Sequence, residues 1–283
     1  MDGFAGTILR IDLATGEIKR QPTPEAFARE WLGARGFISK ILYDEVPRDA
    51  DPLGPENLFV IAPGVLTGTF APAGSKVGMG CISPATNGYA DSSMGGHFGP
   101  ELKYAGYDMV ILENRAAKPQ YLVIDDDKVE LRSAEEYRGK GSLWLERTLK
   151  TKLGADFQIA TIGPAAENGI AFSCVTHDFG RQAGRCGTGA VLGSKKIKAI
   201  AVRGTKSLAV HDLKTLTRST MKIMRRTRKH ENMEPWQKFG TAFFVNWANE
   251  KGCFPTRNFQ TTYYEDAEKI SGERLVDECL VSH

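Results

Sequence analysis

The chain has 283 residues, of which 41% are hydrophobic and 25% are charged, and its formal net charge is +3. These proportions are typical of a folded soluble protein and exclude a disordered or fibrous chain. The small net charge gives no indication of a nucleic-acid partner, and no apolar run approaches the ~20 residues that a membrane span needs. Because the first residues lack the basic and apolar segments of a signal peptide, we expect a cytoplasmic protein that does not enter a membrane.

The first part of the chain predicts a sheet-based fold. Thr7–Gln21 alternates apolar and polar residues around a turn, which indicates a β-hairpin. Thr23-Pro24-Glu25 predicts a helix N-cap with proline at the first helical position, and Gly33 ends that helix. A second helix is expected over Phe37–Tyr43. The segment Leu58–Gly64 begins as a continuous apolar run, which is typical of a strand buried on both faces.

Seven further segments favour strands, and one favours a helix. The helix is expected over Leu143–Leu153, with Gly154 at its C-terminal end. The expected strands are Lys76–Ile82, Asp108–Glu113, Tyr121–Ile124, Lys128–Leu131, Phe157–Ile162, Ile170–Val175 and Ile197–Val202.

Beyond residue 208 the apolar spacing becomes helical. Leu213, Leu216, Met221 and Met224 recur at roughly helical intervals, and a further helix is expected between Thr241 as N-cap and Gly252. We therefore expect one domain over residues 1–208 and the beginning of an all-α domain over residues 209–283.

Two segments share one pattern at a constant offset. Gly95–Leu112 and Arg185–Val202 each predict a glycine-rich turn, a short helix and a strand, with Gly99 aligned to Gly189. Each follows a strand containing a cysteine and then a loop. We interpret the repeat as an internal duplication, so the predicted fold class of the first domain is α+β, with mixed β-sheets, few short helices and pseudo-twofold symmetry.

The two glycine-rich turns are candidate anion sites. A turn that leads into a helix exposes backbone N–H groups, which bind phosphate. Arg181 and Arg185 flank the second turn, and Lys76 and Lys103 lie near the first in sequence. Neither turn has the spacing of a P-loop or of a dinucleotide-binding fingerprint. We therefore expect a ligand with two phosphorylated groups, and the alternative is that the glycines only permit tight turns and close packing.

From Gly6 to Gln260 the sequence resembles the aldehyde ferredoxin oxidoreductase family, tungsten enzymes whose amino-terminal domain holds two pterins around one metal. The resemblance implies oxidation of an aldehyde to a carboxylic acid, with electrons passing through a 4Fe-4S cluster to ferredoxin or a partner subunit. The matching stretches are GTILRIDLATGEIK, WLGARGF, DPLGPENLFVIAPGVLTGT, GGHFGPELKYAGYD, IGPAAENGIAF, GRQAGRCGTGAVLGSKKIKAIAVRG and FGTAFFVNWANEKGCFPTRNFQ.

The resemblance also implies site residues. Each turn would hold one phosphate of the tungsten bis-pterin cofactor (tungstopterin), and a magnesium ion would bridge the two phosphates. Its implied ligands are Ser93 and a carbonyl of either Gln182 or Ala183. The implied cofactor-binding residues are Lys76, Ser93, Gly95, Gly96, Arg181, Gln182, Ala183, Gly184 and Arg185.

Three positions depart from the family pattern, which has arginine at Lys76, asparagine at Ser93 and glycine at Cys186. Serine still offers an oxygen to magnesium, and lysine still offers a charge to phosphate. Cys186 is either a thiol near the metal or a small residue in place of glycine. His97 and His177 are either donors to the ligand or structural residues, and we assign neither a catalytic role.

The family's cluster motif, C-x-x-C-x-x-x-C, is expected beyond His283. The five cysteines form no C-x-x-C pair, so we expect mainly buried thiols rather than a disulfide framework or a cluster. The chain is therefore expected to be a fragment or one piece of a split enzyme that cannot complete the active site alone. Two alternatives stay open: the tungsten subunit of a benzoyl-coenzyme A reductase, and a non-catalytic scaffold that keeps the fold. The sequence does not determine whether the metal is tungsten or molybdenum, which substrate is used, or whether the protein is a homo-oligomer.

Overall fold

The computed structural model describes residues 1–279, which divide into two compact units, residues 1–217 and the residues from 218 onward. The boundary that the sequence suggested, at residue 208, lies in the irregular segment between β12 (Ile197–Arg203) and α7 (Leu213–Arg228).

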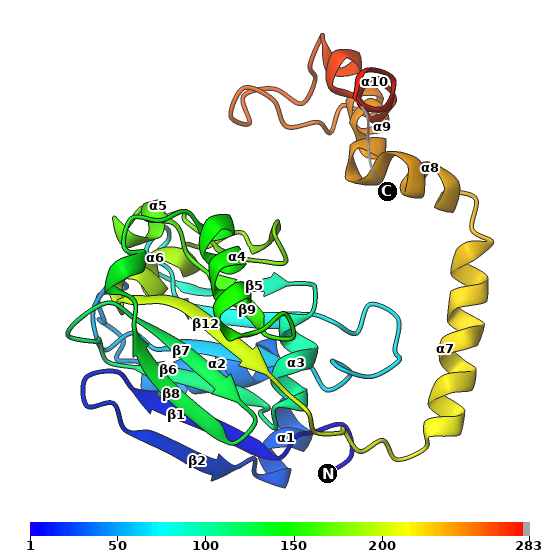
Figure 1. The fold of residues 1–283 in the computed structure, drawn as a ribbon. Coiled ribbons are helices and arrows are strands. Elements are labelled where there is room, and N and C mark those ends of the chain that lie inside the picture. The colour runs from blue at the N-terminus through cyan, green and yellow to red at the C-terminus, as the bar shows by residue number, and fades with distance from the viewer. Residues whose placement is uncertain (280–283) are drawn as a thin grey trace. The chain divides into compact units, whose positions relative to one another are not determined.

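The first sheet of the first unit has six strands in the order β2-β1-β6-β3-β4-β5 (Figure 1). β1 and β6 are parallel, and all other neighbours are antiparallel. The predicted opening hairpin is confirmed as the pair β1 and β2. The strands are β1 (Thr7–Asp12), β2 (Ile18–Pro22), β3 (Phe59–Pro63), β4 (Val77–Ile82), β5 (Tyr89–Met94) and β6 (Met109–Glu113).

The second sheet has six strands in the order β11-β10-β9-β12-β7-β8. β7 and β12 are parallel, and all other neighbours are antiparallel. The strands are β7 (Gln120–Asp125), β8 (Lys128–Ser133), β9 (Gln158–Thr161), β10 (Val175–His177), β11 (Arg181–Ala183) and β12 (Ile197–Arg203).

The two sheets repeat one topology. Starting from the hairpin edge, the orders β2-β1-β6-β3-β4-β5 and β8-β7-β12-β9-β10-β11 correspond strand by strand, including the single parallel pair in each. The short helices α3 (Phe98–Tyr104) and α6 (Thr188–Ser194) occupy equivalent places at the offset that the sequence alignment gave. The predicted duplication and the α+β class are therefore confirmed.

The core of this unit lies between the sheets. The inner faces of both sheets form one buried apolar cluster, which includes Phe98 and Leu102 of α3 and Val191 and Leu192 of α6. α3 contacts β3 of the first sheet and β9 and β12 of the second, and α6 contacts β4 and β12. Each of these two helices therefore packs against strands of both halves of the duplicated domain, of which the first holds β1–β6 and the second holds β7–β12.

Helices cover the outer faces of the sheets. α2 (Arg35–Glu45) packs on β3 and β4, with Phe37, Ile38 and Leu42 buried, and α4 (Ser142–Leu153) packs on β9. Since β3 is buried on both faces, its continuous apolar sequence is explained. The remaining short elements of this unit are α1 (Glu25–Trp31), η1 (Glu135–Tyr137) and α5 (Pro164–Glu167).

The strand expected over Ile170–Val175 is wrong, because β10 begins only at Val175. The backbone of Ser173 and Cys174 lies against α6 instead. The carbonyl of Ser173 accepts a hydrogen bond from Gly189 N–H (3.1 Å), and a Cβ on Gly189 would come within 2.6 Å of the Cys174 carbonyl oxygen. Contact with the helix therefore replaces the sheet pairing that the apolar residues suggested.

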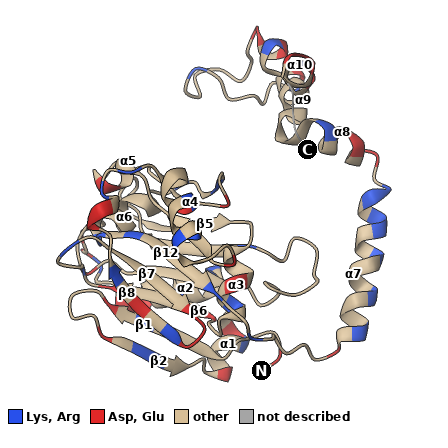
Figure 2. Cartoon of the chain, in the orientation of Figure 1, with Lys and Arg blue, Asp and Glu red and all other residues tan. Residues whose placement is uncertain are grey.

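The second unit is helical. Figure 2 shows Lys and Arg along α7, and its cations from Lys222 to Arg228 are exposed. The N-cap expected at Thr241 is wrong, since Thr241 lies within the 3₁₀ turn η2 and Phe243 precedes α9. The further elements are α8 (Met233–Phe239), η2 (Gly240–Phe243), α9 (Phe244–Glu250), η3 (Ala267–Ile270) and α10 (Gly272–Glu278).

Among residues 1–279, no helix combines the length and apolar content that crossing a bilayer requires. The expectation of mainly buried thiols is wrong. Cys81 is buried, Cys174 and Cys186 are partly exposed, and Cys253 and Cys279 are exposed.

Candidate cofactor-binding site

The two glycine-rich turns lie next to each other. The first follows β5 and the second follows β11, and these two edge strands contact each other across the two sheets. The backbone N–H of Arg185 donates to the hydroxyl of Ser92 on β5 (3.3 Å). The turns that the duplication related in sequence are therefore adjacent in space.

Arg181 reaches from the second half to the first turn. A Cβ on Gly95 would lie 3.8 Å from the Arg181 guanidinium, and a Cβ on Gly96 would lie 2.8 Å from Arg181 Cδ and would also overlap the carboxylate of Asp178. Gly96 has a left-handed φ of +97°, which favours glycine. The second half therefore fits closely against a turn that only a residue without Cβ can form.

His177 holds the beginning of α3. Its imidazole is fully buried, and its Nε2 accepts hydrogen bonds from the backbone N–H groups of His97 (3.2 Å) and Phe98 (3.0 Å). Its Nδ1 lies 3.2 Å from the carbonyl oxygen of Ile159. A neutral imidazole with its proton on Nδ1 satisfies these contacts. His177 is thus a structural residue, and the first amides of α3 are occupied by the protein itself.

Carboxylates surround this histidine. Asp178 accepts from His97 Nδ1 (2.8 Å). Burial alone would raise the pKa of Asp178, but the hydrogen bonds from the side chain and the backbone N–H of His97 hold it below the ordinary range. Burial lowers the pKa of His177, against the charge of Asp178. Burial also raises the pKa of Glu146, whose Oε1 lies 3.9 Å from His177 Nδ1. A neutral His177 therefore joins the two halves.

The second turn presents free amides. Cys186 and Gly187 have left-handed φ angles of +72° and +71°, and within residues 1–279 the backbone N–H groups of Cys186, Gly187 and Thr188 have no acceptor. A Cβ on Gly187 would overlap the carbonyl oxygen of Ala171. Cys186 thus adopts a backbone conformation that glycine usually takes, which agrees with its interpretation as a replacement for glycine.

Three of the predicted cations are available to a ligand, and one is not. Lys76, Arg181 and Arg185 are exposed, and their side chains have no hydrogen-bond or ion-pair partner in the described part of the chain. Lys103 is buried and donates to the carbonyls of Gly3, Gly64 and Val65. Sequence proximity to the first turn was therefore misleading for Lys103.

The candidate magnesium ligands lie on the two adjoining edge strands. Ser93 is exposed on β5, where it pairs with Gly78, and Gln182 is exposed on β11. The carbonyl oxygen of Ala183 accepts from Thr188 Oγ1 (3.1 Å), and Ala183 is buried where β11 pairs with β10. Gly184 has room beside it, since a Cβ there would meet only Gln182, at 3.8 Å or more.

The chain shows two features together: a duplicated α+β domain, and a pair of adjacent glycine-rich turns with unpaired cations and free amides. The chain belongs to the aldehyde ferredoxin oxidoreductase family. Residues 8–204 match the description "Aldehyde ferredoxin oxidoreductase, N-terminal domain", and residues 218–283 match "Aldehyde ferredoxin oxidoreductase, domains 2 & 3".

Similar proteins include the tungsten-containing aldehyde ferredoxin oxidoreductase of Thermococcus kodakarensis, at 42% identity over 99% of this chain and 47% of the relative. The aliphatic sulfonate oxidoreductase, WOR-like subunit, of Pyrococcus furiosus is 32% identical over 95% of this chain and 45% of the relative. A solved structure, the active site complex BamBC of benzoyl coenzyme A reductase with 1,5-dienoyl-CoA, matches with a TM-score of 0.85 at 30% identity, covering 99% of this chain and 45% of that chain. The chain thus spans about half the length of the curated relatives that it matches.

Sequence reasoning missed three residues that shape the site. Ser92 fixes the second turn, Asp178 binds His97, and Glu146 accepts from Phe179 N–H (3.0 Å) behind His177. The position of Asp178 beside His177 was the one available signal. The other two residues act across long sequence separations, where no local pattern exists.

Proposed function

We propose that this chain forms the cofactor-binding base of a tungsten oxidoreductase that oxidises aldehydes to carboxylic acids and passes the electrons to ferredoxin or an electron-transfer subunit. The observation that carries the proposal is the pair of adjacent turns with unpaired Arg181 and Arg185. The similarity to enzymes named tungsten-containing aldehyde ferredoxin oxidoreductases supports it. We further propose that the protein acts in the cytoplasm.

The residues of the second turn fit a phosphate of a bis-pterin cofactor. Guanidinium groups bind phosphate through paired hydrogen bonds, and Arg181 and Arg185 are free to do so. The free amides of Cys186, Gly187 and Thr188 add neutral donors to the same site. When bound, the tungsten and its pterins supply the two-electron chemistry, and this chain positions them and neutralises their charge.

The first turn offers a weaker set of donors. The amides of His97 and Phe98 already bind His177, so Gly95 and Gly96 provide the backbone contacts that remain there, and Lys76 provides the cation. Arg181 adds a second charge from across the interface. We propose that the second phosphate is held by these groups from both halves.

We propose that magnesium bridges the two phosphates through Ser93 and a carbonyl of Gln182 or Ala183, because a hard cation prefers oxygen ligands. We also propose that a 4Fe-4S cluster of the whole enzyme takes its ligands from outside residues 1–279. Within these residues the one group of three potential metal ligands is His97, His177 and Asp178, which contains no cysteine.

The test is cofactor loading in the complete protein, produced anaerobically with tungstate. Tungsten is measured by mass spectrometry and pterin by fluorescence after oxidation. Arg181→Gln together with Arg185→Gln is expected to lower both at unchanged folded content. Arg147→Gln, an exposed arginine on α4, is the matched control. Full loading of the double variant would refute the proposed site.

Activity separates the candidate reactions. Aldehyde-dependent reduction of a viologen dye supports the leading proposal. The benzoyl-coenzyme A reductase type is retained because of the similarity to BamBC, and oxidation of a dienoyl-CoA by the same preparation would favour it. A loaded protein without either activity would favour a non-catalytic scaffold.

A further inference from the structure

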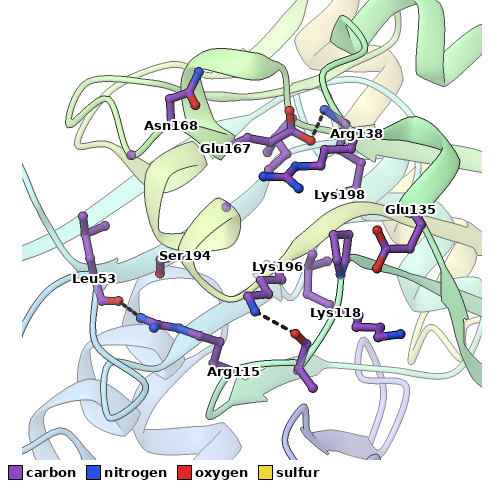
Figure 3. A pocket seen from close by; sticks show the side chains of 16 residues that line it. Leu53, Arg115, Lys118, Glu135, Arg138, Glu167, Asn168, Ser194, Lys196 and Lys198 are labelled. Atoms are coloured by element: carbon purple, nitrogen blue, oxygen red, sulfur yellow. Dashed lines mark hydrogen bonds and ion pairs between the residues drawn. The ribbon is translucent and has the colours of Figure 1, made fainter.

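A second site lies apart from the glycine-rich turns. A pocket of about 620 Å³ opens where the C-terminal ends of α5 and α6 meet the starts of β7 and β12 (Figure 3). None of the proposed cofactor-binding residues lines it. The volume lies within the roughly 300–1,000 Å³ that is usual for small-molecule sites.

The pocket is basic. It is lined by five cations and two carboxylates, so its formal charge, 5 − 2 = +3, equals that of the whole chain. The cations come from three separate stretches of the chain. They are Arg115, Lys118, Arg138, Lys196 and Lys198, and the carboxylates are Glu135 and Glu167.

Internal contacts account for some of these cations. Lys198 pairs with Glu167 (2.9 Å) and also donates to the carbonyl of Lys140. Lys196 donates to the carbonyl of Ala117 (2.7 Å), and Arg115 donates to the carbonyl of Leu53. Because a carbonyl contact leaves the positive charge uncompensated, Arg115 and Lys196 remain attractive to an anion.

Two cations of the pocket are exposed and available to a ligand. Lys118 and Arg138 are exposed at the pocket, and within residues 1–279 neither side chain makes a hydrogen bond or an ion pair. Figure 3 shows Lys118 and Lys196 on one side and Arg138 on another. The apolar lining residues with exposed surface are Leu53, Ala117 and Pro119, whereas Ile162 and Ile197 are buried. The pocket thus combines free charge with a small apolar surface.

We propose that this pocket binds a small organic anion, with a phosphate monoester or dicarboxylate as the chemical class. Arg115 and Arg138 offer planar forks that match phosphate or carboxylate oxygens, and the apolar residues would contact the body of the molecule. The concave shape favours a small molecule over the flat surface of an acidic protein. This proposal is independent of the cofactor site and of the reaction.

The ligand class is tested by isothermal titration of the complete protein with phenyl phosphate, terephthalate, inorganic phosphate and the neutral benzyl alcohol. Phenyl phosphate and terephthalate separate the two anion chemistries, and inorganic phosphate reports the contribution of the apolar body. We expect an organic anion to bind, benzyl alcohol not to bind, and added salt to weaken binding.

Variants locate the binding. Lys118→Gln with Arg138→Gln is expected to weaken binding of the organic anion about tenfold or more, a loss of about 1.4 kcal/mol or more, because it removes both free charges of the pocket. Glu135→Gln removes a carboxylate that repels an anion and is expected to tighten binding of the organic anion. Arg147→Gln, an exposed arginine outside the pocket, is expected to leave binding unchanged.

The cofactor turns also attract anions, so Arg181→Gln with Arg185→Gln is the decisive control. If that pair abolishes binding while the pocket variants do not, the pocket proposal fails. It fails equally if no anion binds, if benzyl alcohol binds as well as phenyl phosphate, or if an oligoglutamate peptide binds more tightly than either small anion.

Discussion

The replacement of His177 by alanine tests whether one buried side chain of the second half fixes the first turn. The substitution removes the acceptor for the amides of His97 and Phe98. A buried amide left unpaired costs about 1–3 kcal/mol, and loss of a buried ring leaves a cavity that adds to this. We expect the free energy of unfolding to fall by about 3–5 kcal/mol.

Two measurements are needed. Denaturant unfolding followed by circular dichroism gives the free energy, and hydrogen exchange measured over Gly95–Tyr104 reports whether the loss is local to α3. His177→Gln places an oxygen acceptor near the position of Nε2 and is expected to recover part of the stability. His211→Ala, an exposed histidine, is the control.

A loss below about 1 kcal/mol, with exchange over Gly95–Tyr104 unchanged, would refute the reasoning. It would mean that α3 keeps its position through packing of Phe98 and Leu102 alone. In that case His177 would not be the link between the halves.

Gly187→Ala is expected to destabilise the protein by about 2 kcal/mol or more in thermal and denaturant unfolding, because its left-handed φ and the overlap with the Ala171 carbonyl both oppose a Cβ; Gly184→Ala, which has room, should change it little. Burial lowers the pKa of Lys103 from 10.5 to about 8. Between these pH values the folded state binds fewer protons than the unfolded state, so the free energy of unfolding rises with pH, by up to about 3 kcal/mol for this group. Denaturant unfolding from pH 7.5 to 10 should show a smaller rise in Lys103→Met than in the unmodified protein. Burial holds the pKa of His177 below its ordinary value of 6.5. The folded state therefore binds fewer protons than the unfolded state, and the free energy of unfolding should fall as pH drops below about 6.5. In His177→Gln the free energy of unfolding should fall less steeply between pH 7 and 5.

Most of the sheets could be predicted because their strands carry strong local signals. β3 reads as an unbroken apolar run, and β1 with β2 reads as an alternating hairpin. The edge strands β5 and β11 were missed. Their sequences, YADSSM and RQA, are polar and short, and they become strands because β4 and β10 offer hydrogen-bonding partners.

In the candidate site, too, local features could be predicted from the sequence and long-range contacts could not. The repeated turn and helix identified where the two turns lie, because glycine requirements are local. The assignment of His177 to α3 and of Arg181 to the first turn depends on how the halves meet. Such contacts join residues about eighty positions apart in the chain, and no spacing in the sequence encodes them.

The exchange of contacts between the halves has a consequence for assembly. His177 of the later half secures α3 of the earlier one, while Ser92 of the earlier half secures Arg185 of the later one. Neither glycine-rich turn is therefore fully held in place until both halves of the domain have folded. If the proposed cofactor binds both turns, we expect its complete site to form only after both halves of the domain have folded and packed together.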